Sequence, residues 1–537
     1  MDSANTADVM AKYIGAVGSE FVFAYPGDPI IEFMERATQH GLQVILARRE
    51  GTAAFMAEAY GMFTGRPGVV LSTLGPGSTA LVNGIAAATL DKAPVLAISG
   101  QVETSREAYF THQVVDHKLV FSPVTKWAGR MEAAAVGTTM RKALRLAMAE
   151  RPGATHLTVA GDTFQAETKD TDVFVPPAAA AVETVDVFRA PDGADPIALI
   201  SKARKPVVLA GTGAVRSSAT AALTAFAELV GAPVVVAPMA KGVIAEDHPL
   251  FAGVLDMACN QVMWDFLADS DLIITAGFDG VELIKPWTVK TPVLHIDTVP
   301  NVDQIYRSDC ELVGNVGATL RWRAGEWNGE PRDGVGRVQA CRQQLLETYY
   351  AGRVQGSLNP TDVIDVARAG FPGETIVTCD VGSHKLLVGQ GWQTLRPRST
   401  FMTNGLSAMG FGVPAAIALK LAAPDRPVLA MVGDGGFAMT ASELRLASSL
   451  GLGMVFVVFV DGSLNRIELK QMARGYPSVA TRIEDTDLVM LAEAMGCDGV
   501  RVATAAELEK CLADTGALTR PLVVEARINP AQYEAQF

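Results

Sequence analysis

The residues that most clearly suggest a chemical role are 433–436. Their sequence is Gly-Asp-Gly-Gly, and it follows an apolar run typical of a buried strand. Glycines in such a turn let the backbone approach phosphate oxygens, and the N-terminus of a following helix favours anions. Taken alone, an Asp-Gly turn is also ordinary turn chemistry. The run therefore predicts a phosphate site only if other residues support it.

Asp461 supplies that support. It lies 27 residues after Asp434 (461 − 434), at the end of the next apolar run. Because adjacent parallel strands deliver their carboxyl ends to the same edge of a sheet, we expect the two carboxylates to lie close together. With the backbone carbonyl of Ser463 they offer the oxygen ligands that Mg²⁺ prefers, and phosphate oxygens complete the shell. The spacing predicts a joint phosphate and Mg²⁺ site.

Glu50 is a third carboxylate with a chemical interpretation. It follows the apolar residues Ile45 and Leu46 and opens an Ala-rich stretch typical of a helix. A carboxyl group in this place could exchange a proton with a bound ligand. The structural alternative is a glutamate stabilised by the positive end of the helix dipole. The spacing alone favours that alternative.

Three blocks of alternating strands and helices must position these side chains. Short β-rich runs followed by Ala-rich stretches indicate parallel sheets with helices on both faces. We expect an α/β fold with three doubly wound parallel-sheet domains at residues 1–165, 186–325 and 340–537. The predicted strands are 21–24, 69–72, 95–99, 206–210, 234–237, 272–276, 293–296, 375–379, 428–432, 454–460 and 522–525.

The blocks are separated by segments rich in proline, glycine or charge. Residues 175–177 (Val-Pro-Pro) and 191–193 (Pro-Asp-Gly) predict a first linker, and residues 326–336 a second. The first and third blocks resemble each other: each has an apolar strand, a glycine turn (at Gly75 and Gly433), an Ala-rich helix and another apolar strand. We interpret them as similar domains flanking a third.

Composition excludes several classes of function. The net charge is −13 and no Lys/Arg-rich run is present, so nucleic acid is not an expected partner. The six cysteines are scattered without a CxxC pair, which fits neither a disulfide framework nor a zinc site and favours a cytoplasmic setting. No signal peptide is evident, and the apolar stretch at 454–460 is too short to span a bilayer, so no membrane association is expected.

The Gly-Asp-Gly turn, followed at this distance by a second oxygen ligand, resembles the motif of the thiamine diphosphate-dependent enzymes. The family usually carries Asn where this chain has Asp461. The extra negative charge would be offset by the metal. The resemblance implies thiamine diphosphate and Mg²⁺ as cofactors, with Asp434, Asp461 and Ser463 as the metal ligands.

The same resemblance assigns Glu50 as the catalytic carboxyl that hydrogen-bonds the aminopyrimidine ring of the cofactor, with Arg49 where many members have His. Pro26 and Gly27 resemble the turn that covers this ring. Met409 resembles the apolar wedge between the two rings of the cofactor, although a lone Met is more often part of a core. The other cofactor-binding positions implied are Thr73, Asn83, Gly382, Ser383, His384, Gly405, Ser407, Gly433, Gly435, Gly436 and Asn465.

Within this superfamily the chain most resembles acetolactate synthase of the FAD-independent type. Residues 111–116, 123–126 and 271–279 carry that resemblance. FAD is not expected, because residues 277–281 are Gly-Phe-Asp-Gly-Val where FAD-binding relatives carry Arg-Phe-Asp-Asp-Arg. The partial dinucleotide turn at 211–213 lacks the rest of its fingerprint.

The resemblance to acetolactate synthase implies that a 2-oxo acid, with pyruvate as the expected substrate, loses CO₂ and that the remaining fragment joins a second carbonyl compound. His112 and Gln113 would then donate hydrogen bonds to a developing alkoxide, the alternative being a surface loop. In the family the active sites lie between subunits, so a homodimer or homotetramer is implied.

Residues 464–471 leave the substrate open. They also resemble carboxyethylarginine synthase, and sulfoacetaldehyde acetyltransferase and 2-hydroxyacyl-CoA lyase are further alternatives. Arg466 and Lys470 could bind a substrate carboxylate, but such residues more often form a solvated helix face. Two other classes stay open: a cofactor-binding protein without catalysis, against which the intact Glu50 argues, and a nicotinamide dehydrogenase.

Overall fold

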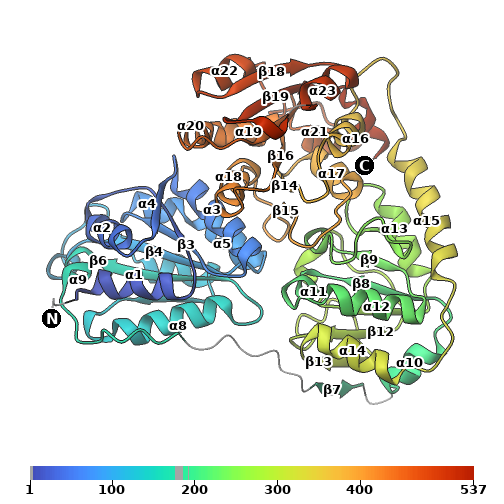
Figure 1. Cartoon of the computed structure of the whole chain (residues 1–537), viewed down its shortest axis with the longest axis horizontal. Coiled ribbons are helices and arrows are strands. Elements are labelled where there is room, and N and C mark those ends of the chain that lie inside the picture. Colours follow the sequence, from blue (N-terminus) through green and yellow to red (C-terminus); the bar gives the residue numbers. More distant parts are fainter. Residues whose placement is uncertain (1–3, 176–184, 191–192, 514, 537) are drawn as a thin grey trace. The chain divides into compact units, whose positions relative to one another are not determined.

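The structure is a computed structural model that describes residues 4–175, 185–190, 193–513 and 515–536 (Figure 1). Most of the predicted first linker, at 176–184 and 191–192, lies outside these residues. The described chain forms three sheets whose strands run parallel, apart from one antiparallel pair in the second sheet. The predicted α/β fold, with three sheets of mainly parallel strands, is confirmed.

The first sheet has the strand order β2-β1-β3-β4-β6-β5. Its four inner strands are buried along their whole length. The sequences of β1 and β3 are accordingly almost wholly apolar, whereas β4 and β6 also carry buried polar residues. Helices α1, α2 and α8 pack against one face, and α3 and α5 against the other (Figure 1). The strands are β1 (Phe21–Ala24), β2 (Gln43–Leu46), β3 (Gly68–Ser72), β4 (Val95–Gln101), β5 (Trp127–Arg130) and β6 (Ala154–Ala160).

The third sheet repeats this arrangement. Its order is β15-β14-β16-β17-β19-β18, which is the first sheet's order when each sheet's strands are counted along the chain. The likeness between the first and third blocks therefore extends to topology. The strands are β14 (Ile376–Cys379), β15 (Thr400–Met402), β16 (Val428–Gly433), β17 (Val455–Val460), β18 (Asp498–Val502) and β19 (Leu522–Arg527).

The second sheet has a different order, β10-β9-β8-β11-β12-β13-β7, and β7 pairs antiparallel with β13. The chain order reverses between β8 and β11, where loops at the carboxyl ends of two neighbouring strands diverge. The strands are β7 (Asp186–Arg189), β8 (Pro206–Ala210), β9 (Val234–Val236), β10 (Phe251–Val254), β11 (Leu272–Ala276), β12 (Val293–Asp297) and β13 (Cys310–Val313).

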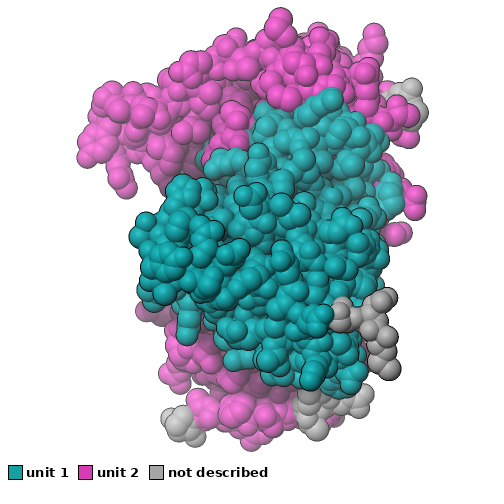
Figure 2. All heavy atoms as spheres, turned by 90° about the vertical axis from the view of Figure 1, so that its left-hand side faces the viewer, with its two compact units in different colours: residues 1–180, 405–424, 440–452 teal, residues 181–404, 425–439, 453–537 magenta. Residues whose placement is uncertain are grey.

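The chain divides into two compact units (Figure 2). The first comprises Met1–Ala180, Gly405–Pro424 and Thr440–Leu452, so two segments of the third block group with the first sheet. Its helices are α1 (Thr6–Ala16), α2 (Ile31–Gln39), α3 (Glu50–Thr64), α4 (Pro76–Ala80), α5 (Val82–Leu90), α6 (Thr104–Glu107), α7 (His117–Phe121), α8 (Val136–Met148), α9 (Gly161–Gln165), α18 (Gly412–Ala422) and α20 (Leu444–Ser449).

The second unit comprises Ala181–Asn404, Asp425–Met439 and Gly453–Phe537. None of the helices in the described part of the chain has the length and apolarity needed to cross a membrane. The remaining helices are α10 (Pro196–Lys202), α11 (Thr212–Arg216), α12 (Thr220–Val230), α13 (Asn260–Ala268), α14 (Val316–Glu326), α15 (Gly334–Tyr349), α16 (Pro360–Gly370), α17 (Ser383–Gly391), α19 (Asp434–Thr440), α21 (Asn465–Ala473), α22 (Leu488–Ala494) and α23 (Ala505–Leu512).

Candidate functional site

Four residues gather at the carboxyl edge of the first sheet, and we call them the first-unit site: Gly27, Glu50, Thr73 and Gly77. A Cβ atom on Gly77 would lie 3.1 Å from Glu50 Oε1 and 2.7 Å from Thr73 Cγ2. A Cβ atom on Gly27 would lie 2.3 Å from Thr73 Oγ1. Any larger residue at either glycine would collide with Thr73. The glycines thus permit the close approach that brings these side chains together.

The sheet explains why residues so far apart in sequence meet here. Gly27 follows β1, Glu50 follows β2 and Thr73 follows β3, and these three strands are parallel neighbours. Parallel neighbours end at the same edge, where α/β proteins bind ligands. Pro26 is an exposed residue of the turn that carries Gly27. Glu50 itself is the first residue of α3.

The loop after β4 carries His112 and Gln113, and both are exposed. Gln113 adopts a left-handed conformation with φ 59°. A Cβ atom on Gly75 would lie 2.6 Å from the carbonyl oxygen of Gln113, so this loop lies against the turn that follows Thr73. The His112 ring packs edge-on to Phe110. Gln113 is therefore brought next to the first-unit site by its backbone.

Residues of the 405–409 segment also belong to the first unit but contact another part of it. The backbone N–H of Gly405 donates to Asp91 Oδ1 (2.5 Å), directly after the C-terminal end of α5. Asn83, by contrast, is an exposed residue near the N-terminal end of the same helix. Ser407 has a positive φ of 53° and Met409 is half-buried. The predicted cofactor residues of the first unit thus lie in two separate groups.

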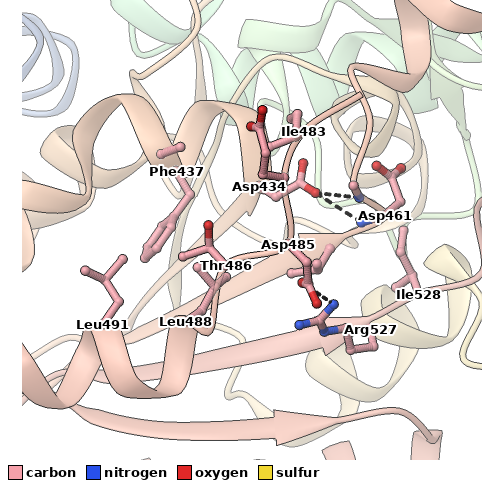
Figure 3. A pocket seen from close by; sticks show the side chains of 14 residues that line it. Asp434, Phe437, Asp461, Ile483, Asp485, Thr486, Leu488, Leu491, Arg527 and Ile528 are labelled. Carbon is pink, nitrogen blue, oxygen red and sulfur yellow. Dashed lines mark hydrogen bonds and ion pairs between the residues drawn. The ribbon is translucent and has the colours of Figure 1, made fainter. Parts of the chain in front are cut away.

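Asp434 and Asp461 meet in the second unit, as their spacing predicts (Figure 3). Asp434 Oδ2 accepts hydrogen bonds from the backbone N–H groups of Asp461 (3.2 Å) and Gly462 (2.8 Å). The backbone N–H of Ser463 donates to Asp461 Oδ1 at 3.0 Å. We call Asp434, Asp461 and the residues around them the second-unit site. It lies where β16 and β17 end side by side.

The electrostatics of this pair favour a cation. Burial raises the pKa of Asp434, and burial together with the neighbouring Asp434 charge raises the pKa of Asp461 to about 7. Two carboxylates in a shared, partly buried space repel each other unless positive charge is brought between them. Among the described residues no group of three or more His, Cys, Asp and Glu side chains could hold a metal ion. A metal bound here would need further oxygen ligands, such as phosphate.

The loop after β17 is held by side-chain contacts. Ser463 Oγ donates to Glu468 Oε2 (2.5 Å), and Glu468 pairs with Arg482 (2.7 Å). Ser383 Oγ donates to Asn465 Oδ1 (2.8 Å). Ser383 thus contacts Asn465, which lies two residues after Ser463, and all three are predicted cofactor residues.

His384 and the glycines around it form a cradle suited to an anion. The ring of His384 is buried and stacks on Phe459, and burial lowers its pKa to about 3. Its Nε2 has no hydrogen-bond partner among the described residues. A Cβ atom on Gly382 or Gly433 would lie 2.7 or 2.9 Å from this ring. An orphaned imidazole nitrogen beside exposed backbone fits a diphosphate group.

A pocket of 320 Å³ lies beside Asp434 and Asp461 (Figure 3). Phe437, Leu488 and Leu491 form its apolar wall. Arg527 also lines it, and its guanidinium is engaged by Asp485 at 2.6 Å.

Two acidic residues near these sites were missed by the sequence analysis. Asp380 lies directly after β14, and a Cβ atom on Gly436 would lie 2.7 Å from its Oδ2. The rule that identified Asp434, a polar residue at the end of an apolar strand, also applies to Asp380. Glu443 contacts the residues around Glu50. No local pattern in the sequence indicates that contact.

The chain is also similar to known protein families. Three domain families match the chain: the N-terminal TPP binding domain of thiamine pyrophosphate enzymes at residues 4–120, their central domain at 194–322, and their C-terminal TPP binding domain at 380–526. Thiamine pyrophosphate is another name for thiamine diphosphate. The first match contains Glu50, and the last contains Asp434 and Asp461.

Similar proteins match along nearly the whole chain. Acetolactate synthase of Bacillus subtilis (strain 168) is 28% identical over 97% of this chain and 93% of its own length. The catabolic acetolactate synthase of Raoultella terrigena is 30% identical over 97% of this chain and 94% of its own length. A probable acetolactate synthase large subunit of Methanocaldococcus jannaschii is 29% identical over 98% and 92%.

Proposed function

Because the chain belongs to the thiamine pyrophosphate enzyme family, we propose that it decarboxylates a 2-oxo acid, pyruvate first among them, and joins the remaining fragment to a second carbonyl compound. The observation that carries this proposal is the nearly full-length similarity to proteins named acetolactate synthase. Glu50 and the Asp434–Asp461 pair lie within the matched domains, which supports a complete set of catalytic groups.

The second-unit site would hold the diphosphate of the cofactor and its Mg²⁺. Asp434, Asp461 and the carbonyl of Ser463 are the proposed metal ligands. Backbone N–H groups of the glycine turns at 382 and 433–436 and the orphaned nitrogen of His384 would bind the diphosphate, beside Ser383 and Asn465. The chain thereby provides both a cation site and an anion cradle.

When bound, the cofactor supplies a carbon nucleophile and accepts the negative charge left by the loss of CO₂. Glu50 is the proposed catalytic carboxyl that holds and transfers a proton at the aminopyrimidine ring. Pro26, Gly27, Thr73 and Asn83 are proposed to bind this ring, with Gly405, Ser407 and Met409. His112 and Gln113 are proposed to donate hydrogen bonds to oxygen atoms of the substrate as negative charge develops on them.

We propose that the protein works as a homodimer or homotetramer in the cytoplasm, with each active site built from two subunits. The family resemblance supports this assembly. It also supports domain limits at 1–165, 186–325 and 340–537.

We also propose that FAD is not bound, and the central sheet supports this. Glu282 is buried, and its Oε1 and Oε2 each accept the Thr212 N–H at 3.1 Å, at the partial dinucleotide turn. A Cβ atom on Gly211 would lie 2.5 Å from Glu282 Oε2. The chain's own carboxylate therefore takes the backbone donor that a dinucleotide phosphate would use.

The decisive experiment incubates the purified protein with pyruvate, thiamine diphosphate and Mg²⁺ and measures CO₂ and acetolactate. Formation of both products is the expected result. CO₂ release without acetolactate would mean that another carbonyl compound is the acceptor. No product from pyruvate despite bound cofactor would favour a carboxyethylarginine synthase, a sulfoacetaldehyde acetyltransferase or a 2-hydroxyacyl-CoA lyase. Absence of cofactor binding in calorimetry would overturn the proposal.

A further inference from the structure

Helix α3, which begins at Glu50, has no cap from its own sequence. Its N-cap residue is Arg49, whose extended backbone precedes the helix and whose side chain makes no capping hydrogen bond. Arginine lacks the acceptor oxygen with which Ser, Thr, Asp or Asn satisfies the free N–H groups of a first turn. The corner that carries Glu50 is therefore not fixed by a side-chain cap at its N-terminus.

Glu443, from another part of the same compact unit, contacts both sides of this corner. It ends a short turn, Ala441–Glu443, and is fully buried. Its Oε1 accepts the backbone N–H of Arg48 (2.8 Å) and the hydroxyl of Thr52 (2.5 Å). Glu443 thus binds Arg48, two positions before Glu50, and Thr52, two positions after it.

The hydrogen bonds of Glu443 stabilise the backbone on both sides of Glu50. Thr52 Oγ1 also lies 2.7 Å from the Arg49 carbonyl, so its single hydroxyl proton is shared between that carbonyl and the nearer Glu443 Oε1. A carboxylate at a helix N-terminus gains from the helix dipole, and hydrogen bonds to an ionised acceptor are stronger than neutral ones. Burial raises the pKa of Glu443, while its bonds to Thr52 and Arg48 oppose that shift.

We propose that Glu443 is a positioning residue for Glu50: by binding residues 48 and 52 it sets the direction in which the Glu50 carboxyl faces the cofactor. This inference rests on the proposed function. The space around Glu50 is narrow, since a Cβ atom on Gly77 would lie 3.1 Å from its Oε1. Misplacing a catalytic group by about 1 Å can cost about a hundredfold in rate. The diphosphate is held by other residues, so cofactor affinity should respond much less.

The first test is Glu443→Gln, with thiamine diphosphate affinity measured by calorimetry and kcat measured with the active 2-oxo acid. We expect kcat to fall about tenfold or more while the dissociation constant of the cofactor changes less than about threefold. The circular-dichroism signal of the aminopyrimidine tautomer should weaken in parallel with kcat. The control is Glu58→Gln, which should keep kcat within about twofold. Glu58, like Glu443, is a fully buried glutamate, and it lies in α3.

Thr52 gives a second test that does not depend on how well Glu443→Gln folds. Thr52→Ser keeps the hydroxyl and should retain kcat, whereas Thr52→Val should lower it about three- to tenfold. Thr64→Val is the matched control, because Thr64 donates to the Tyr60 carbonyl at the other end of α3. The double variant Glu443→Gln/Thr52→Val should lose less than the product of the single losses, since both changes remove one contact.

The outcomes separate the two levels of the argument. If wild type binds the cofactor and Glu50→Gln loses turnover, but Glu443→Gln and Thr52→Val both keep wild-type kcat and dichroism, the positioning role is wrong and the proposed function stands. If melting temperature falls in both variants without any change in kcat, Glu443 is only a structural cap and the inference is again overturned. A wild-type protein that binds no thiamine diphosphate overturns both.

Discussion

The two carboxylate sites of this chain handle buried negative charge in opposite ways. In the first unit, Glu443 receives hydrogen bonds from a backbone N–H and a hydroxyl, both supplied by the chain itself. In the second unit, Asp434 and Asp461 lie next to each other, and the pKa of Asp461 rises to about 7. Glu443 Oε1 is thus satisfied by the chain itself, while its buried Oε2 has no hydrogen-bond partner among the described residues. In the second unit, by contrast, the charge of Asp434 adds to the burial that raises the pKa of Asp461.

This difference assigns separate tasks to the two units. A site that is satisfied by neutral donors is pre-organised and can hold Glu50 ready for proton transfer. A site with two adjacent carboxylates would gain order from the metal and diphosphate that we propose it binds. Changes in the first unit should therefore alter turnover, and changes in the second unit should alter cofactor affinity.

The largest expected effect tests the first half of that statement. Glu50→Gln keeps the size of the side chain but removes its ability to accept a proton, so kcat should fall about a hundredfold or more. Cofactor affinity should stay within about threefold of wild type. Steady-state CO₂ release and calorimetry measure the two quantities. Unchanged turnover with any active 2-oxo acid would show that Glu50 is not the catalytic carboxyl.

Asp434→Asn is the counterpart in the second unit. The amide removes one negative charge from the proposed metal site. It also places an NH₂ group against at least one of the three backbone N–H groups that now donate to the two Asp434 oxygens. Replacing groups that only support metal ligands typically costs 10–100-fold in affinity, so loss of a ligand should weaken Mg²⁺ and cofactor binding at least about tenfold. Titration with Mg²⁺ at fixed thiamine diphosphate measures this. Normal affinity in this variant would remove Asp434 from the metal site.

We expect low pH to destabilise the folded first unit through two buried histidines, His117 and His156. His156 Nε2 lies 3.0 Å from the Ser99 hydroxyl, which is hydrogen-bonded to Ser72, beside Thr73. His117 packs edge-on to His156, and burial lowers the pKa of His117 to about 4. Because the fold disfavours the protonated ring, its contribution is fully present above pH 6.5, the unfolded pKa, and is lost as the pH falls toward 4.

The loss should reach about 3 kcal/mol for a shift of this size. His117→Phe removes the titrating group and keeps an aromatic ring, so its melting temperature should fall less than that of wild type between pH 6.5 and 4. Thermal unfolding of the cofactor-free protein over this range measures the difference. Parallel curves for the two proteins would show that His117 does not drive the acid sensitivity.

The parts of this comparison that lie in local sequence could be predicted. Val-, Leu- and Ile-rich runs predicted strands 206–210 and 272–276 with the bounds that the structure has. Polar residues directly after apolar strands also predicted the site at Asp434 and Asp461, because parallel strands bring their following loops to one edge of the sheet. Strands β5, β6, β7, β10, β13, β15 and β18 were missed. The residues of β7 and β18 are largely exposed and lack an apolar run, whereas β6 is buried but carries Thr155, His156 and Thr158 among its apolar residues.

The contacts that arise only from tertiary packing could not be predicted. Glu443 and Arg48 are 395 residues apart, and nothing near residue 443 indicates a contact with the residues around Glu50. The grouping of residues 405–424 and 440–452 with the first sheet is equally invisible in sequence. Gln113 shows a related case, because its left-handed φ of 59° follows from packing against Gly75.

The smallest expected effect concerns Asp461, where the family usually has Asn. Asp461→Asn keeps the oxygen that accepts the Ser463 N–H and removes the repulsion with Asp434. At pH 8 the melting temperature of the cofactor-free protein should rise by about 2–4 °C, the shift that about 1 kcal/mol produces in a domain of this size. Cofactor affinity should stay within about threefold, because Asn still offers an oxygen ligand. A loss of affinity as large as that of Asp434→Asn would mean that the second unit depends on both negative charges, and that the metal is held more by charge than by geometry.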